Sequence, residues 1–299
     1  MVATPLIETA RAKVNLTLEV LGKRADGYHE LRSIVAFADF GDELTYAPSE
    51  AFSLAVSGPM AGAIDGANLI EKAVASLAPL LSQGGAEAPS GRFDLVKRIP
   101  VAAGLGGGSA DAAAAIRAML RARPDIRPDE RQVERAALAI GADVPVCLRQ
   151  ETAFMGGVGE QVRPLPQPAP FPALIVNPGV KLATRDVFAA LSAPALASAA
   201  DFRRDADLMR ARLESEGWRA VLLAGRNDLE PPARRLSPVI DDVLAMIDAA
   251  PGCWLARLSG SGPTCFGLFE TADAADAAAR AIGARRPSWW MTATELGSR

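Results

Sequence analysis

A run of glycines directly before an alanine-rich segment is the feature that most constrains this chain. Four of the five residues at 104–108 are glycine, and Ser109 and a series of alanines follow. Glycine permits backbone conformations that a Cβ would forbid, and alanine is the strongest helix former. Serine is a preferred N-cap. The pattern therefore predicts a loop that opens directly into a helix, with Ser109 as its cap and an end before Pro124.

A loop of this kind is typical of phosphate binding. The first backbone N–H groups of a helix have no intrahelical partner, and the helix dipole favours negative charge there. The segment lacks the Gly-Lys-Ser/Thr ending of a Walker P-loop. It also lacks the Gly-x-Gly-x-x-Gly spacing and the early position that are usual for a dinucleotide fold. An ordinary flexible turn is the structural alternative.

The composition narrows the class of partner. The 299 residues suffice for two domains or one large one, and a formal net charge of −3 gives no basic excess for nucleic acid. The first residues include an acid and lack the apolar core of a secretion signal. No run of about 18 apolar residues is present, so we expect no membrane span. These features predict a cytoplasmic protein that binds neither nucleic acid nor membrane.

The scarcity of histidine and cysteine limits the possible chemistry. His29 is the single histidine, and the cysteines are Cys147, Cys253 and Cys265, with no C-x-x-C pair. Zinc sites usually need several such ligands, and Ser-His-Asp catalysis needs a histidine oriented by a carboxylate. An odd number of cysteines also argues against a disulfide framework. Catalysis is therefore expected to depend mainly on lysine, aspartate, serine and backbone groups.

Two charged residues are candidates for that chemistry. Polar and apolar residues alternate over 13–20, which predicts a strand with Lys13 and Asn15 on the same face. On the pattern alone, a lysine at the start of a strand is usually a solvated edge residue. Asp143 lies between Gly141 and an apolar segment that we interpret as a strand, where a carboxylate is costly unless it is paired. A cap or turn is the alternative role for Asp143.

The segment at 23–30 brings together rare residue types. The chain has two tyrosines and one histidine, and Tyr28 and His29 are adjacent, just after an Asp-Gly turn signal. Two neighbouring rings can stack on a nucleobase and hydrogen-bond to its edge. A capped hairpin with rings on its surface is the alternative interpretation.

Apolar spacing and turn residues predict alternating strands and helices along the chain. Asn68 is expected to cap a helix that ends near residue 81, and a loop is expected at 84–91. Prolines at every second position over 164–172 predict a stiff crossing, which we take as the domain boundary. The second half is expected to be helices packed on an antiparallel sheet. Further expected elements are strands at 33–40, 43–47, 52–56, 93–98, 173–177, 254–258, 264–270 and 289–295, helices at 128–141, 205–216, 238–249 and 273–283, a helix capped by Thr184 that contains Phe188, and turns at 41–42 and 154–159.

Taken together, these segments resemble the GHMP kinase superfamily of small-molecule kinases. The Pro-x-x-x-Gly-Leu-Gly-Gly-Gly-Ser loop at 100–109 matches the phosphate signature of that superfamily. Four further segments are similar to the branch that phosphorylates cytidylyl-methylerythritol in the non-mevalonate isoprenoid pathway. These segments are Ala12–Leu16, Arg24–Leu31, Gly141–Pro145 and Leu258–Thr264.

The resemblance implies an α+β, two-domain GHMP kinase fold. Residues 1–165 would form an ATP-binding domain like domain 2 of ribosomal protein S5, and residues 166–299 a ferredoxin-like substrate domain. The implied reaction transfers the γ-phosphoryl group of ATP to the 2-hydroxyl of cytidylyl-methylerythritol, with Mg²⁺ bridging the phosphates. No protein ligand for the metal can be assigned. The implied assembly is a monomer or a homodimer.

The same resemblance assigns individual residues. The catalytic pair is Lys13 and Asp143: Asp143 would accept or orient the hydroxyl proton, and Lys13 would neutralise developing charge. The ATP-binding residues are Asn68, Pro100, Val101, Ala102, Ala103, Gly104, Leu105, Gly106, Gly107, Gly108, Ser109 and Ala110. The substrate-binding residues are Asn15, Tyr28, His29, Thr184 and Phe188. The chain departs from the family at Ala102 and Ala103, where relatives often have glycine, and at Val35, where a relative has an aromatic ring.

Three alternatives stay open at this point. A kinase of the homoserine or mevalonate type would share the glycine loop, but its substrate has no base for Tyr28 and His29 to hold. A non-catalytic ligand sensor on the same fold would bind ATP without turnover. An NAD-dependent oxidoreductase is disfavoured because the loop follows about a hundred residues of other structure and lacks the later acid of a Rossmann fold.

Overall fold

The computed structural model describes residues 5–64, 68–82, 90–198 and 200–297. Most of the loop expected at 84–91 therefore lies outside the described residues. The chain divides into two compact units, and each is described separately. The first contains Met1–Ala12, Phe40–Val101 and Gly106–Gln150, and the second contains Lys13–Asp39, Ala102–Leu105 and Glu151–Arg299. Among the described residues, no helix has the length and apolar character needed to cross a bilayer.

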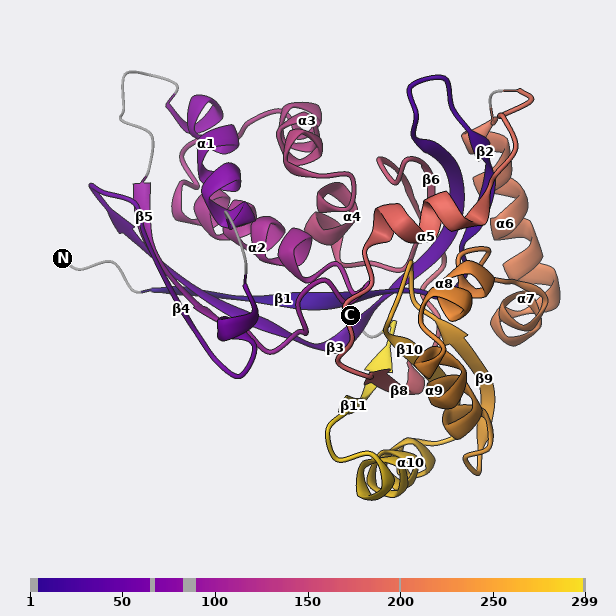
Figure 1. The fold of residues 1–299 in the computed structure, drawn as a ribbon. Coiled ribbons are helices and arrows are strands. Elements are labelled where there is room, and N and C mark those ends of the chain that lie inside the picture. Colours follow the sequence, from indigo (N-terminus) through magenta and orange to yellow (C-terminus); the bar gives the residue numbers. More distant parts are fainter. Residues whose placement is uncertain (1–4, 65–67, 83–89, 199, 298–299) are drawn as a thin grey trace. The chain divides into compact units, whose positions relative to one another are not determined.

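The sheet of the first unit is built on the second half of strand β3 (His29–Ser49). Strand β5 (Ser90–Val96) pairs antiparallel with it, from Glu43 opposite Val96 to Ser49 opposite Ser90. Strand β4 (Ser53–Ser57) extends the sheet as a parallel neighbour of β5, and β1 (Leu6–Asn15) also pairs with β3. Figure 1 shows these strands as one twisted layer.

Four helices cover one side of this layer (Figure 1). They are α1 (Leu69–Leu81), α2 (Gly107–Ala122), α3 (Glu130–Ile140) and α4 (Val144–Arg149), and a short 3₁₀ turn, η1 (Ala61–Ala63), precedes them. Helix α2 packs against α1 and α4, and nine of its residues are buried, six of them alanine. The expected helices at 69–81 and 128–141 are confirmed. A capping box of Asp129 and Gln132 begins α3.

A predicted turn and a predicted strand in the first unit are wrong. Gly41-Asp42 was expected to be a turn, but β3 continues through it. A Cβ on Gly41 would lie 2.8 Å from the Cα of Arg11, so this glycine allows strand β1 to approach closely. Residues 144–146 were expected to be a strand, but they begin helix α4. Pro145 lies in its first turn, where proline is well tolerated.

The second unit has two groups of strands. The first half of β3 pairs antiparallel with β2 (Glu19–Lys23) and with β6 (Ala153–Gly157), and β6 pairs with β7 (Gln161–Pro164). The other group has the order β11-β8-β10-β9, all antiparallel neighbours. Its members are β8 (Phe171–Asn177), β9 (Cys253–Leu258), β10 (Cys265–Phe269) and β11 (Trp290–Leu296). The expected turn at 154–159 is instead mostly strand β6.

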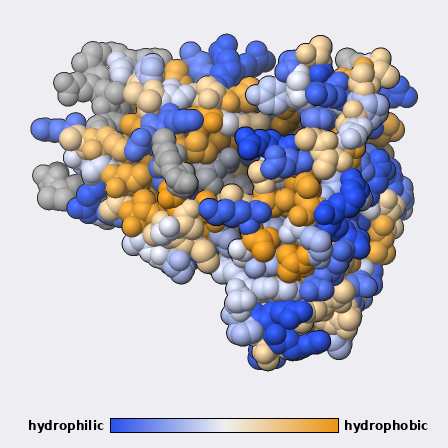
Figure 2. Space-filling model, viewed as in Figure 1, coloured by the Kyte–Doolittle hydropathy of each residue, from blue (hydrophilic) through white to orange (hydrophobic). Residues whose placement is uncertain are grey.

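Helices α9 (Val239–Asp248) and α10 (Ala272–Arg285) pack on the β8–β10 sheet and enclose an apolar core. Helix α10 is amphipathic: Ala275, Ala278 and Ile282 are buried, and hydrophilic side chains predominate where α10 lies, at the foot of Figure 2. Helices packed on an antiparallel sheet were expected here and are confirmed. The remaining helices are α5 (Thr184–Leu191), α6 (Phe202–Glu216), α7 (Trp218–Ala224) and α8 (Glu230–Leu236), of which α7 and α8 were not predicted.

Candidate active site

The second half of the glycine loop leads directly into helix α2 in the first unit. Gly106 has a left-handed backbone, with φ of 64°, and the helix begins at Gly107. The predicted cap is therefore wrong: Ser109 is already the third helical residue, and no side chain caps the first turn. The backbone of Gly106 turns the chain into the helix without a capping side chain. The first amides of α2 thus have no side-chain acceptor, as an anion site requires.

Several predicted residues of the first unit lie close to this helix start. A Cβ on Gly108 would lie 3.5 Å from a methyl group of Leu69, the first residue of α1. Asn68 caps that helix by accepting the backbone N–H of Ile70 at 3.0 Å, as expected. A Cβ on Gly141 would lie 4.0 Å from the hydroxyl of Ser109. The starts of α1 and α2 and the end of α3 therefore converge.

Asp143 is the N-cap residue of α4 and not the neighbour of a strand. Its side chain makes no capping hydrogen bond, so the alternative role as a helix cap is not realised. The preceding Gly141 ends α3 next to Ser109. Asp143 is thus only two residues from the segment that contacts the glycine loop.

The first half of the glycine loop lies in the second unit, packed against two other segments. The carbonyl of Leu105 accepts the backbone N–H of Lys13 at 2.9 Å. The carbonyl of Gly104 accepts the hydroxyl of Ser259 at 3.0 Å. A Cβ on Gly104 would lie 2.6 Å from the carbonyl oxygen of Ser259, so only glycine fits there. Ala102 has a left-handed φ of 53°, which is unusual for a residue with a side chain.

The other predicted residues of the loop divide into buried anchors and an exposed tip. Ala103 and Leu105 are 3% and 1% exposed, whereas Val101 is 37% exposed. Pro100 precedes this tip, and Ala110 donates its backbone N–H to Gly106 at 2.8 Å, within the first turn of α2.

Lys13 and Asn15 are neighbours in the second unit, as their predicted common face requires. The ammonium of Lys13 donates to the side-chain oxygen of Asn15 at 3.2 Å. The amide of Asn15 donates to the hydroxyl of Ser33 at 2.8 Å, and the Asn15 backbone N–H donates to the hydroxyl of Ser259 at 3.2 Å. Both side chains are buried, at 4% and 5% exposure, so Lys13 is not a solvated edge residue. This network fixes Asn15 from three directions.

Thr184 joins the same region through the loop that precedes β10. It is the first residue of α5 and not its cap, and its hydroxyl lies 2.9 Å from that of Ser261. Asn227 holds the loop by donating to the carbonyls of Leu258 and Gly260, both at 2.8 Å. The Ser-Gly-Ser-Gly-Pro sequence was recognised as a small-residue loop, but Ser259, Ser261 and Asn227 were not identified as site residues.

The predicted aromatic residues are only partly brought together. The rings of His29 and Phe188 stack with their centroids 4.7 Å apart and an angle of 27° between their planes. Tyr28 is 65% exposed, and Val35 is completely buried in β3. Burial lowers the pKa of His29, and the nearby positive charge of Lys23 lowers it further. The imidazole is therefore favoured in its neutral form, which can both donate and accept a hydrogen bond.

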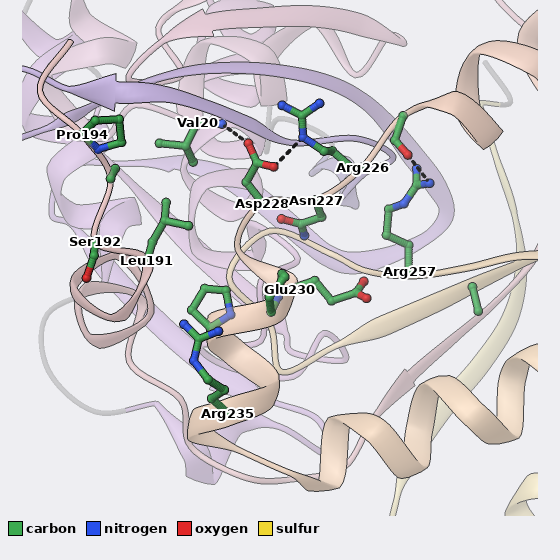
Figure 3. Close-up of a pocket in the computed structure, with 15 residues that line it drawn as sticks. Val20, Leu191, Ser192, Pro194, Arg226, Asn227, Asp228, Glu230, Arg235 and Arg257 are labelled. Carbon is green, nitrogen blue, oxygen red and sulfur yellow. Dashed lines mark hydrogen bonds and ion pairs between the residues drawn. The ribbon is translucent and has the colours of Figure 1, made fainter.

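A pocket of about 660 Å³ is lined by residues that include Asn227, Asp228 and Arg257 (Figure 3). None of the predicted site residues lines it. Its charged groups have partners: Asp228 accepts from the backbone of Val20 at 2.8 Å and from Arg226 at 2.6 Å. Arg257 donates to the carbonyls of Leu16, Leu222 and Gly225. The pocket wall thus supports the segment that follows Asn15.

The structure does not test the roles assigned to the predicted site residues. Lys13 belongs to the second unit and Asp143 to the first, so their action as a pair stays a prediction. Within each unit, the expected residues do converge: Asn68, Ser109 and the start of α2 in the first, and Lys13, Asn15, Gly104 and Thr184 in the second.

Comparison with known proteins decides the family. The sequence model of the GHMP kinases N terminal domain matches residues 68–151, and that of the GHMP kinases C terminal region matches residues 199–287. A Rhodopseudomonas palustris (strain BisB18) protein named 4-diphosphocytidyl-2-C-methyl-D-erythritol kinase is 47% identical over 297 residues, covering 98% of this chain and 95% of that protein. The chain belongs to the GHMP kinases. The resemblance and the fold class expected from the sequence are confirmed.

One further relative and two solved structures are also similar to this chain. A Nitrobacter hamburgensis protein with the same name is 48% identical over 299 residues, covering 98% of this chain and 96% of that protein. A crystal structure of 4-(cytidine 5'-diphospho)-2C-methyl-D-erythritol kinase matches with a TM-score of 0.77 and 33% identity, covering 98% and 100% of the two chains. Homoserine kinase from Cytophaga hutchinsonii matches with a TM-score of 0.70 and 20% identity, covering 98% and 96%, which shows a shared fold.

Proposed function

We propose that this GHMP kinase transfers the γ-phosphoryl group of ATP to the 2-hydroxyl of 4-diphosphocytidyl-2-C-methyl-D-erythritol, in the non-mevalonate isoprenoid pathway. The observation that carries the proposal is 47% identity over nearly the whole chain to proteins that bear the name of this kinase. Phosphoryl transfer requires mainly positioning and charge stabilisation from the protein. We propose that the glycine loop, Lys13 and Asp143 supply both.

The glycine loop is the proposed site of the ATP phosphates. Its support is the uncapped start of α2 after Gly106, because unpaired amides and the helix dipole favour an anion there. A Cβ on Gly104 would lie 2.6 Å from the carbonyl oxygen of Ser259, so this position of the loop offers backbone and no side chain to the proposed ligand. Asn68 and residues 100–110 form the proposed ATP-binding set.

The stacked His29 and Phe188 rings support a site for the cytidine group. Stacking on an aromatic face and hydrogen bonding by a neutral imidazole are the interactions that a pyrimidine base offers. Tyr28, exposed beside His29, is proposed to cover the base. Thr184 and Asn15 are proposed to contact the rest of the substrate, through the region fixed by Ser259 and Ser261.

Two charged groups are proposed to act on the reacting hydroxyl. The carboxylate of Asp143 would accept its proton as the oxygen attacks the γ-phosphorus, and the leaving group would be ADP. The ammonium of Lys13, oriented by Asn15, would stabilise the negative charge that develops on the transferred group. Both roles are carried over from the family resemblance.

Mg²⁺ belongs to the proposal as the ion carried on the ATP phosphates, where it neutralises charge. Mg²⁺ is commonly held by substrate phosphates and water, with few protein ligands. Over the described ranges, no group of three or more His, Cys, Asp or Glu side chains could hold a metal ion. We assign no protein ligand to the ion.

The proposal extends to the organisation of the chain. Residues 1–165 are proposed to bind ATP and residues 166–299 to complete the substrate site. A cytoplasmic location is also proposed, because the reaction consumes ATP. The proposed assembly is a monomer or a homodimer, which light scattering would distinguish.

An ADP-release assay with three acceptors tests the proposed function. The purified chain should turn over cytidylyl-methylerythritol and MgATP, with little ADP release when homoserine or mevalonate replaces the acceptor. Equal turnover of homoserine or mevalonate would contradict the proposal. Tyr28→Ala should raise the KM for the cytidylyl substrate and leave the KM for ATP nearly unchanged, whereas equal increases would remove Tyr28 from the nucleobase site.

A further inference from the structure

Three charged side chains are buried together behind the start of helix α2 in the first unit. The ammonium of Lys97 donates to a carboxylate oxygen of Asp42 at 2.5 Å and to one of Asp111 at 2.6 Å. The side chains of Lys97, Asp42 and Asp111 are 4%, 0% and 3% exposed. We call these three residues the buried charge cluster. No sequence motif marks this cluster, and the proposed reaction assigns no role to its three residues.

The cluster contacts the chain on both sides of the glycine loop. One oxygen of Asp42 accepts the backbone N–H groups of residues 98 and 99, at 2.5 and 2.8 Å, just before the loop. Asp111 is the fifth residue of α2, just after it. A Cβ on Gly107 would lie only 3.1 Å from the Lys97 nitrogen, so the ammonium lies directly behind the first residue of the helix.

The two carboxylates differ in their hydrogen bonds. Both oxygens of Asp42 accept hydrogen bonds, one from the backbone and the other from Lys97. Asp111 accepts from Lys97 with Oδ2 only, and its buried Oδ1 has no hydrogen-bond partner among the described residues. One ammonium therefore faces two carboxylates, and a buried oxygen without a donor is costly when it is charged. Asp111 is the member of the cluster that can take up a proton without losing a contact.

The surroundings of Asp111 also favour its protonated form. Burial raises the pKa of Asp111 to about 7, with Asp42 adding to the increase and Lys97 opposing it. Other charged groups on the packed helices point elsewhere. Glu71 and Lys72 of α1 are exposed, and Arg149 of α4 pairs with Glu130 and Glu134 of α3.

We propose that Asp111 is a positioning residue for the ATP phosphates and that it takes up a proton from solvent when they bind. The inference rests on the proposed function, because it assumes that the phosphates contact the amides at the start of α2. Additional negative charge there disfavours the ionised form of Asp111. Protonation at Oδ1 leaves Oδ2 bonded to Lys97, so the ammonium keeps both carboxyl contacts and the loop keeps its support. Affinity for MgATP should therefore fall as the pH rises through the pKa of Asp111.

Calorimetric titration of the wild-type chain with MgATP tests the proton uptake directly. Titrations at about pH 7.5, in buffers with different ionisation enthalpies, should show uptake of a fraction of a proton per nucleotide bound. The result does not depend on the folding of any variant. Absence of uptake throughout the range from about pH 6.5 to pH 8.5 would overturn the proposal.

A pair of variants assigns the proton. Asp111→Asn should abolish the uptake, flatten the pH dependence of MgATP binding and bind MgATP about fivefold more tightly than wild type at high pH. Glu8→Gln is the matched control: Glu8 also pairs with α2, through Arg117 at 2.8 Å, but farther along the helix. Glu8→Gln should retain the uptake. Retention of uptake by a folded Asp111→Asn variant would show that another group takes up the proton.

The same measurements separate this inference from the proposed function. If wild-type protein binds MgATP with proton uptake but does not phosphorylate the cytidylyl substrate, the proposed function fails and the role of Asp111 stands. If the substrate is phosphorylated but nucleotide binding takes up no proton, the proposed function stands and the role of Asp111 fails. If wild-type protein binds no MgATP, both are overturned.

Discussion

The hydroxyl of Ser259 donates a hydrogen bond to the carbonyl of Gly104, with the two oxygens 3.0 Å apart. The same hydroxyl accepts the backbone N–H of Asn15 at 3.2 Å. One small side chain therefore connects the first half of the glycine loop with the strand end that carries Lys13. This connection links the geometry of the phosphate loop to that of a proposed catalytic residue within the second unit.

Replacing Ser259 should affect both stability and catalysis. Ser259→Ala leaves the buried N–H of Asn15 and the carbonyl of Gly104 without this partner, which should lower the free energy of unfolding by about 1–3 kcal/mol. We expect a higher KM for ATP in the same variant. Ser215→Ala is the control, because Ser215 is exposed and bonds only within α6. Urea unfolding and steady-state kinetics should distinguish the two variants, and equal, small effects would contradict the assigned role.

Glycine 104 should be more sensitive to substitution than a glycine of the same conformation elsewhere. Gly104 and Gly179 have φ of 77° and 76°, but a Cβ would contact nothing at 179 and would lie 2.6 Å from the Ser259 carbonyl at 104. Both substitutions to alanine incur a left-handed backbone cost of about 1–2 kcal/mol. Only Gly104→Ala adds a backbone clash and should weaken MgATP binding. Thermal unfolding and nucleotide titration measure the difference, and equal losses at the two sites would count against close packing at 104.

The single histidine allows a direct measurement of the stacked pair. The His29 resonance in a proton NMR titration should give a pKa below about 6.5, because burial against the stack and the Lys23 charge both disfavour the imidazolium. The stability contributed by the neutral ring should be complete above about pH 6.5 and decrease as the pH falls toward the lower folded-state pKa.

Two variants separate the effect of burial on the pKa of His29 from the effect of the Lys23 charge. Phe188→Ala should raise the pKa of His29 by exposing the ring, and Lys23→Met should raise it by removing the charge. A His29 pKa above the ordinary value in wild-type protein would contradict the stacked arrangement.

Asp143 should be essential for turnover but not for folding. Asp143→Asn removes the proposed proton acceptor and should reduce kcat by about 10²–10⁴-fold at unchanged thermal stability. Asp129→Asn is a matched control, because Asp129 is also an N-cap aspartate in the first unit and asparagine caps helices equally well. The control should keep wild-type activity. Near-normal turnover of folded Asp143→Asn would remove Asp143 from the reaction.

The local features of the fold could be predicted well from the sequence. Helix α1 and its Asn68 cap follow from four-residue apolar spacing and a capping residue, and the loop-to-helix transition after 104–108 follows from glycine and alanine. The cap at Ser109 was wrong because left-handed Gly106 already turns the chain, so the helix starts three residues earlier than a Ser109 cap predicts.

Features that depend on distant contacts could not be predicted. The Gly41-Asp42 pair has the composition of a turn, but glycine at 41 makes room for β1 and Asp42 belongs to the buried charge cluster. The short apolar run at 144–146 fits a strand or a buried helix equally well. In the structure it is helical, and all three of its residues are buried. Asn227 lies more than 30 residues along the chain from the loop that it holds, and its neighbours in the sequence give no signal of this role.

The small side chains of α2 have a consequence for how this enzyme can vary. Helix α2, which follows the glycine loop, contains six buried alanines, and α1 and α4 pack against this helix. A bulkier residue at any of these positions would push the helix away from its neighbours and carry the loop with it. Mutational tolerance should therefore be lowest at the buried positions of this helix, and a library of single substitutions would show reduced fitness there as far along the helix as residue 118.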